Sequence, residues 1–185
     1  LIANNFISLG SSGDYGITIE NSVHTDIYYN SIFVNSNSNN SAAFHSASGA
    51  IEATVNVRNN NFANLNYGYV VYTGTPGVIS EMDHNNLYTA GNFVSYWGNE
   101  KIMKLRDLQQ VSGKNSNSLS VFPHYTAFDD LHTIAPWLDG RGIPLPDITV
   151  DMDGEQRDGQ APDIGADEFT PDPATITPIS GTYTI

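Results

Sequence analysis

The stretch Asn60-Asn61-Phe62-Ala63 is one of four related copies in the first hundred residues. The others are Asn4-Asn5-Phe6-Ile7, Asn30-Ser31-Ile32-Phe33 and Asn85-Asn86-Leu87-Tyr88. Each copy places Asn or Ser directly before an apolar pair, and Phe6, Ile32, Phe62 and Leu87 follow one another at intervals of 26, 30 and 25 residues. A period of this length is typical of solenoids, in which each repeat forms one coil.

Short runs with β-strand character lie between these copies. They cover residues 15–20, 26–29, 53–57, 67–72 and 78–82, and Gly, Asn and Ser bound them. Strands this short, repeated about once per 25 residues, stack best as parallel ladders around a linear core. The polar tract at 35–41 predicts an outward loop in the longest repeat.

Eighteen of the twenty asparagines lie before residue 100. Asn tolerates the left-handed conformation that a tight corner between strands needs. Where Asn recurs at the same corner of successive coils, its amide can bond to the amides above and below. We therefore expect an asparagine ladder. Disorder is the other interpretation of such a composition, but a disordered chain lacks the recurring apolar partners.

Residues 101–111 have a different pattern, with apolar side chains at Ile102, Leu105 and Leu108 and a glycine at 113. This spacing predicts an amphipathic helix that stops at the glycine. Three of the seven basic residues lie here. A basic patch for an acidic glycan is one interpretation, whereas a solvated helix face needs no further assumption.

The most acidic stretch runs from Thr149 to Phe169. Its strand-like runs at 148–150 and 163–166 flank a loop with Gly154 and Gly159, which permit positive φ angles. It surrounds a single cation, Arg157, with seven carboxylates: Asp151, Asp153, Glu155, Asp158, Asp163, Asp167 and Glu168.

The segments D-x-D-G-x-x-R at 151–157 and D-I-G-A-D-E at 163–168 resemble the ending of many right-handed parallel β-helix proteins on bacterial surfaces. In that family a helix, an N-S-L-S-x-x-P run and a D-L-H-type strand precede the ending, matched here by residues 101–111, 117–123 and 130–134. The resemblance covers residues 98–170, and the coils before them by their period. It implies an all-β, right-handed parallel β-helix whose C-terminal end is capped by one short helix and the acidic motif.

This organisation divides the chain into coils at 1–97 and a terminal coil, capping helix and acidic closing motif at 98–170. Residues 171–185 are expected to be a proline-punctuated linker and the start of a further module. Because the chain opens at Leu1 without Met, we interpret it as a piece of a longer polypeptide.

The acidic stretch has two interpretations. Asp151, Asp153, Glu155 and Asp158 offer the oxygen ligands that calcium prefers, although Pro162 stands where an EF-hand would place its last Glu. Alternatively, Arg157 is a structural counter-ion that fixes the turn by bonds to carboxylates such as Asp163 or Glu168.

The catalytic candidates are Glu81 and Asp83, two residues apart on one predicted strand. They would share a face, as the paired carboxylates of a glycosidase do, but a solvated strand face explains them equally well. His84 beside Asp83 is a candidate base, and the five histidines show no zinc-type spacing. Six aromatic residues form either a sugar-stacking platform or core packing: Tyr67, Tyr69, Tyr72, Tyr88, Tyr96 and Trp97.

Charge and composition narrow the class of protein. Seven Lys and Arg against twenty Asp and Glu give a net charge of −13, which argues against nucleic acid and anionic membranes as partners. The chain has no cysteine, and no apolar run approaches the roughly 20 residues needed for membrane insertion.

Together with the resemblance, these features predict a non-enzymatic module of a large, secreted protein at the bacterial cell surface, with an adhesion or spacer role. The expected partners are neighbouring modules of the same polypeptide, extracellular glycans and the secretion machinery. The alternative is a truncated carbohydrate-active lyase or hydrolase, or a glycan-binding β-helix. Upstream coils could carry the active site of such an enzyme.

Overall fold

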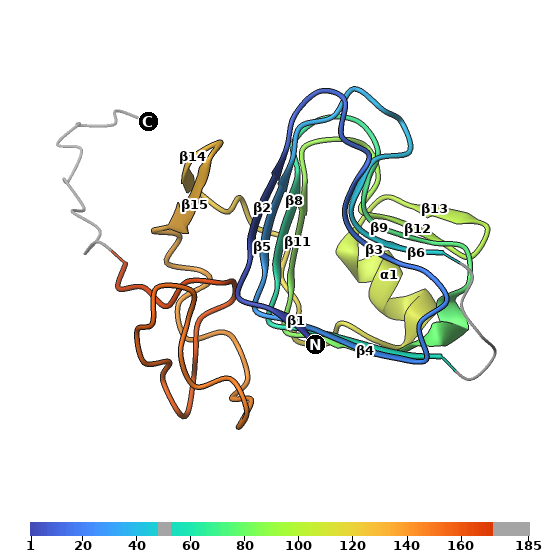
Figure 1. Cartoon of the computed structure of the whole chain (residues 1–185). Coiled ribbons are helices and arrows are strands. Elements are labelled where there is room, and N and C mark those ends of the chain that lie inside the picture. The colour runs from blue at the N-terminus through green and yellow to red at the C-terminus, as the bar shows by residue number, and fades with distance from the viewer. Residues whose placement is uncertain (48–52, 172–185) are drawn as a thin grey trace, which may run out of the picture.

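The computed structural model describes residues 1–47 and 53–171 and forms a parallel β-solenoid. Three ladders of strands run along it, and each turn of the chain adds one strand to each ladder (Figure 1). Four turns are present, with one short α-helix in the described residues. The predicted fold class is therefore confirmed.

Each ladder contains the corresponding strand of every coil. Sheet A contains β1 (Ile2–Ala3), β4 (His24–Tyr28), β7 (Thr54–Arg58) and β10 (Ile79–Asp83). Sheet B contains β2 (Phe6–Leu9), β5 (Ser31–Val34), β8 (Asn61–Asn64) and β11 (Asn86–Thr89). Sheet C contains β3 (Tyr15–Ile19), β6 (Ala42–Ser46), β9 (Tyr69–Thr73), β12 (Ser95–Trp97) and the antiparallel β13 (Glu100–Ile102). A 3-10 turn, η1 (Pro76–Val78), leads into β10.

The register of sheet B bears out the repeat, with one correction. Ile32, Phe62 and Leu87 are direct partners, but Ile7 pairs with Ile32 where the spacing predicted Phe6. The first interval is therefore 25 residues rather than 26. The reason is that Asn5, and not Asn4, occupies the position equivalent to Asn30.

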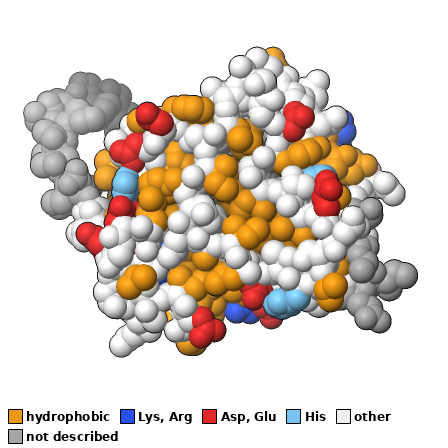
Figure 2. Space-filling view, in the orientation of Figure 1, with side chains coloured by type: hydrophobic (Ala, Val, Ile, Leu, Met, Phe, Trp, Pro, Cys, Tyr) orange, Lys and Arg blue, Asp and Glu red, His pale blue; other side chains and the backbone are white. Residues whose placement is uncertain are grey.

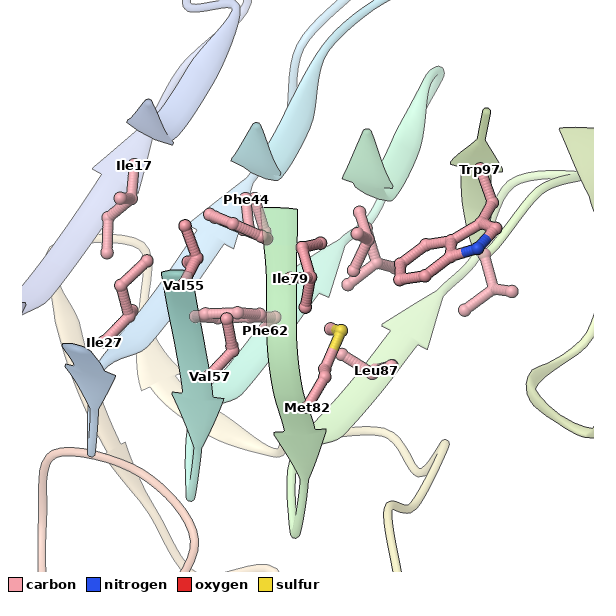
Figure 3. Close-up of a cluster of buried hydrophobic side chains, with 14 of the residues drawn as sticks. Ile17, Ile27, Phe44, Val55, Val57, Phe62, Ile79, Met82, Leu87 and Trp97 are labelled. Atoms are coloured by element: carbon pink, nitrogen blue, oxygen red, sulfur yellow. The ribbon is translucent and has the colours of Figure 1, made fainter. Parts of the chain in front are cut away.

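The core lies between the three sheets, where side chains from all of them meet (Figure 3). Ile27 of sheet A, Phe62 of sheet B and Phe44 of sheet C are all fully buried. The rings of Phe44 and Phe62 stack with centroids 6.4 Å apart. Burial of such apolar side chains is the main favourable contribution to folding.

An asparagine ladder runs along the corner between sheets A and B, as predicted. The side-chain amides of Asn5, Asn30 and Asn60 each donate to the Oδ1 of the next ladder residue, at 2.8, 2.9 and 2.9 Å. The last acceptor is Asn85, whose own backbone N–H donates to Ser118 Oγ at 3.0 Å. The ladder residues of the last three coils, from Asn30 onward, have no exposed surface.

The left-handed corner residue directly precedes each ladder asparagine. These residues are Asn4, Tyr29, Asn59 and His84, with φ of 55°, 53°, 58° and 53°. Asn therefore fills the strained position in two coils only, and Tyr and His adopt it in the others. A positive φ is uncommon for a tyrosine, so the surrounding bonds must hold Tyr29 there.

The predicted helix is confirmed as α1 (Leu105–Ser112), which begins later than expected because β13 pairs with β12 before it. Gly113 ends it in the left-handed conformation, and its N–H donates to Gln109 O at 3.0 Å. Leu108 joins the core. Beyond α1 the chain adds a partial rung, where Leu119 donates to Asn85 O at 2.7 Å. The end of the stack is thereby covered.

A hairpin of β14 (Tyr125–Ala127) and β15 (Asp130–Thr133) then crosses the outer face of sheet B, where a strand at 130–134 was predicted. The rings of Tyr125 and Phe128 lie edge-on to Phe33, with centroids 6.1 and 5.5 Å away. His132 lies edge-on to Phe6 at 4.9 Å. The hairpin therefore covers the first coils from the side.

The closing motif corrects two predictions. Residues 163–166 are not a strand, and residues 148–150 contribute only a bridge between Val150 and Gln156. The buried N–H groups of Ile164, Gly165 and Ala166 donate instead to Leu138 O, Asn59 O and Ser31 Oγ. Because Ser31 and Asn59 belong to the second and third coils, the motif packs against the corner of the solenoid rather than capping the last coil (Figure 1).

The first coil has a partly apolar surface. Ile2, Ile7, Leu9 and Ile19 pack against the core but are only partly buried. Hydrophobic side chains gather over the middle of the face shown in Figure 2. Among the described residues, no helix has the length and hydropathy to cross a membrane.

Candidate functional site

Arg157 is the centre of the closing motif, with an exposed fraction of 4%. Its Nη2 donates to Asn4 Oδ1, Gly165 O and Ala166 O at 3.1, 3.1 and 3.0 Å, and its Nη1 donates to Glu168 Oε2 at 3.3 Å. The guanidinium carbon also lies 3.9 Å from the ring centroid of Tyr29. Burial lowers the pKa of Arg157. The cation thus links the motif to two corner residues.

Most of the predicted carboxylates accept hydrogen bonds from backbone N–H groups. Asp151 accepts from Asp153, Glu155 and Glu168 at 2.9, 2.8 and 3.0 Å. Glu168 accepts from Asp158 and Asp163 at 2.8 and 3.0 Å. These bonds hold the loop in place.

Asp163 is almost fully buried and accepts from Gly140 N at 2.6 Å and Phe169 N at 2.8 Å. Burial raises its pKa to about 7 in spite of these two bonds. Of the three predicted structural residues, Arg157 and Glu168 are in contact. The backbone N–H of Asp163 donates to the same carboxylate oxygen of Glu168 that Arg157 contacts.

The four candidate calcium ligands do not converge in the described residues. Asp151 faces the backbone, and Asp158 accepts from Gln160 N and Ala161 N at 2.7 and 3.0 Å. Only Asp153 belongs to a group of side chains close enough to share a metal ion, and its companions there are His132 and Asp167. The calcium loop stays a prediction.

His132 links the hairpin to the closing motif. Its Nε2 lies 2.9 Å from Asp153 Oδ2, and its Nδ1 is hydrogen-bonded to Asp130 Oδ1. The bond to Asp153, with that to Asp130, raises the pKa of His132 to about 9, while burial raises that of Asp167 to about 6. Neither His132 nor Asp167 was among the predicted site residues. The Asp130-x-His132 spacing before the acidic stretch was the available signal.

The catalytic candidates both have partners. Glu81 forms an ion pair with Arg58, its neighbour on sheet A. Asp83 accepts from the backbone N–H and the side chain of Asn117 at 2.7 and 2.8 Å, and His84 Nδ1 lies 3.6 Å away. Glu81 and Asp83 line a cavity of about 260 Å³.

The outer face of sheet C carries a row of aromatic rings, the aromatic strip, which consists of Tyr15, His45, Tyr72 and Tyr96. The last three are direct register partners on β6, β9 and β12. Centroids are 4.0 Å apart for Tyr15 and His45, 5.4 Å for His45 and Tyr72, and 4.6 Å for Tyr72 and Tyr96. All four side chains are half-buried, whereas Phe44 beside them is fully buried. The strip therefore faces outward.

A cavity of about 590 Å³ adjoins the strip. Tyr69 connects the two, since its ring lies 5.9 Å from Tyr96 and 6.0 Å from Phe93 in the cavity wall. Asparagine amides and one cation, Lys101, complete the polar part of the wall; the amides are those of Asn39, Asn66 and Asn92. Of the other predicted aromatics, Tyr67 is an exposed part of the wall, Trp97 is buried, and Tyr88 lies on sheet B against Phe122.

Comparison with known proteins returns no relative. No family model matches the chain, and neither does any curated protein or solved structure. The function must therefore be argued from the fold and from the chemistry of these surfaces.

Proposed function

We propose that this chain is a non-enzymatic module of a secreted bacterial surface protein and that it binds an extracellular glycan chain along sheet C. The observation that carries this proposal is the aromatic strip. Its rings come from successive coils and form one continuous row on the outside of the solenoid.

Such a row suits a linear sugar polymer. Aromatic faces pack on the apolar faces of sugar rings, and parallel strands repeat the rings at about 4.8 Å, comparable to one monosaccharide. Burial lowers the pKa of His45, so its ring is neutral at pH 7 and presents an uncharged face. The asparagine amides of the adjoining cavity both donate and accept hydrogen bonds, as sugar hydroxyls require.

The ligand is a neutral glycan. A net charge of −13 repels polyanionic chains, and Lys101 is the one cation among the described residues that line the cavity. Bacterial-surface placement rests on the resemblance of the 151–168 stretch. It makes neighbouring modules and the secretion machinery the further partners.

A truncated lyase or hydrolase is the second candidate, because Glu81 and Asp83 share a cavity with Arg58 and Lys114. A base beside cations is what the cleavage of a uronic-acid polymer requires. The non-enzymatic proposal is favoured because both carboxylates already have structural partners. Glu81 forms an ion pair with Arg58, and Asp83 accepts two hydrogen bonds from Asn117.

Binding can be tested by affinity electrophoresis of the whole chain in gels containing xylan, mannan or β-glucan. A stacking ring contributes about 1 kcal/mol, so Tyr72→Ala and Tyr96→Ala should each weaken retention about five-fold. Tyr88→Ala is the matched control, since it removes a half-buried outward ring from sheet B. Equal effects at Tyr72 and Tyr88, or no retention of the wild-type chain, would contradict the proposal.

Turnover is tested separately on the same polysaccharides and on pectin and alginate. Reducing ends and 4,5-unsaturated products should not form. Any activity that disappears in Glu81→Gln or Asp83→Asn would contradict the proposed binding function and support the lyase or hydrolase.

A further inference from the structure

Three side chains meet where β15 approaches the closing motif. His132 comes from the hairpin, whereas Asp153 and Asp167 come from two separate parts of the acidic stretch. One ligand atom from each lies within 4.8 Å of the other two. The distance between His132 Nε2 and Asp153 Oδ2 is 2.9 Å. Two ligands of one ion, with bonds of about 2.0–2.2 Å, lie at a similar separation.

Asp167 provides a second, independent observation. Its exposed fraction is 8%, yet its carboxylate accepts no hydrogen bond from residues 1–47 or 53–171. Asp151, Asp158, Asp163 and Glu168 each accept at least two backbone N–H groups. A carboxylate on a residue with so little exposed surface, and without donors from the described residues, is stabilised by a nearby cation. Asp167 is aimed at the one place where a cation would also meet His132 and Asp153.

The imidazole of His132 is held in position for such an ion. Asp130 accepts from Nδ1, and Phe6 packs edge-on to the ring at 4.9 Å. A carboxylate that accepts from the far nitrogen commonly orients metal-binding histidines and increases their basicity. With Nδ1 occupied, Nε2 is the nitrogen that faces the two aspartates.

We propose that His132 Nε2, Asp153 and Asp167 bind one divalent transition-metal ion. One imidazole with two carboxylates suits Zn²⁺, Mn²⁺ or Fe²⁺, whereas calcium prefers oxygen ligands alone. The half-exposed side chain of Asp153 leaves room for water in the remaining positions. Binding releases to solvent the proton that Nε2 shares with Asp153. The ion would tie the hairpin to the closing motif, and it is separate from the glycan surface on sheet C.

Zinc alone is the probe. The whole chain, treated with a chelator and dialysed, is titrated with ZnCl₂ by calorimetry, and its melting temperature is followed in parallel. We expect one site with a micromolar or lower dissociation constant and a saturable rise in melting temperature, because the ion binds only the folded chain. Co²⁺ should give the absorption bands of a bound nitrogen–oxygen site.

Asp167→Asn should weaken zinc binding at least ten-fold, and it removes a buried charge, so the variant should fold. His132→Gln should abolish the high-affinity site. The matched control is His24→Gln, which removes a surface histidine that likewise contacts an aspartate, Asp26, at 3.2 Å. Circular dichroism verifies that each variant is folded before titration.

Absence of zinc binding by the wild-type chain would overturn the proposal, as would unchanged affinity in both Asp167→Asn and His132→Gln. Calcium binding that equals zinc binding and survives His132→Gln would also overturn it, in favour of the oxygen-only loop. Should His132→Gln fail to fold, the wild-type titration, the Co²⁺ spectrum and Asp167→Asn decide the outcome.

Discussion

Arg157 connects parts of the chain that are far apart in sequence. Its hydrogen bond to Asn4 spans 153 residues, and its other hydrogen-bond partners lie 8 to 11 residues downstream. A buried cation of this kind requires all of its partners, because removal of one side leaves the others desolvated and unpaired.

Arg157→Ala should lower the free energy of unfolding by about 3–5 kcal/mol, because Glu168 loses its buried counter-ion and Asn4, Gly165 and Ala166 each lose a hydrogen bond. Urea denaturation gives this value directly. Arg157→Lys is the control, since it keeps the charge but loses the planar fork, and it should cost less than the alanine. A loss below about 1 kcal/mol for the alanine variant would show that the cation is not structural.

Asp163 should make stability depend on pH. Burial raises its pKa to about 7, as do the charges of Glu168 and Asp139, while bonds from Phe169 N and Gly140 N oppose the rise. The unfolded value is about 3.9, so the folded chain holds this proton more tightly. The stabilising contribution is therefore complete below about pH 4 and is lost as the pH rises through about 7.

Asp163→Asn should remove this dependence. Urea unfolding of the two proteins between about pH 4 and 8 should show a wild-type decline larger by a few kcal/mol. Asp139→Asn, at an exposed neighbour, serves as the control and should keep most of the slope. Parallel curves for the wild type and Asp163→Asn would mean that Asp163 stays ionised throughout.

Single residues were predictable to different degrees. The surplus of carboxylates around one cation correctly indicated that Arg157 needed partners, and Glu168 is one of them. The spacing of Asp130 and His132 was a signal for a paired histidine. It did not indicate the cluster, because Asp153 and Asp167 reach His132 through the fold and not through a local spacing. A local sequence pattern indicates contacts within one helix, strand or loop, whereas this cluster joins three separate segments.

The asparagine ladder stabilises the corner between sheets A and B as a unit. Asn60 donates to Ile27 O, Arg58 O and Asn85 Oδ1, each at 2.9 Å. It also accepts from the backbone and side chain of Asn30 at 3.0 and 2.9 Å. The Asn60 amide therefore satisfies buried groups of its own coil and of both neighbouring coils.

Asn60→Ala should cost about 2–4 kcal/mol, because it leaves buried donors and acceptors unpaired in three coils. Asn37→Ala is the matched control. It removes an exposed amide that bonds across coils to Asn66 at 3.1 Å, and it should change stability by no more than about 0.5 kcal/mol. Chemical denaturation gives the free energy of unfolding of both variants. Similar losses of stability would show that the ladder contributes no more than an exposed amide does.

Elements were predicted well wherever a repeat constrained them. The strands at 15–20, 53–57 and 78–82 appear within a residue or two, because each must place its apolar residues inside the same core. The run at 163–166 looked like a strand but is not one, since no strand lies beside it to accept its N–H groups. Apolar character indicates burial and does not identify the hydrogen-bond partner.

At the scale of the whole molecule, the period predicted a solenoid of stacked coils, and the resemblance predicted the order of the later elements. Neither indicated that residues 120–169 fold back beside the first coils. That arrangement depends on contacts such as Phe6 with His132 and Asn4 with Arg157. Such contacts between distant residues produce no repeating pattern in the sequence. Tyr72 and Tyr96 of the aromatic strip were among the predicted rings, but Tyr15 and His45 were not. The outward direction of the strip required the register of sheet C.

The return of the closing motif to the first coils determines how the molecule would respond to a pulling force. Tension applied to the chain just beyond Phe169 reaches the solenoid through Arg157, Gly165 and Ala166, which are bonded to Asn4, Asn59 and Ser31. These anchors belong to the first three coils, so the load is shared sideways among them and does not peel the last coil away. A solenoid that would otherwise unravel coil by coil from that end is thereby made to resist as a block.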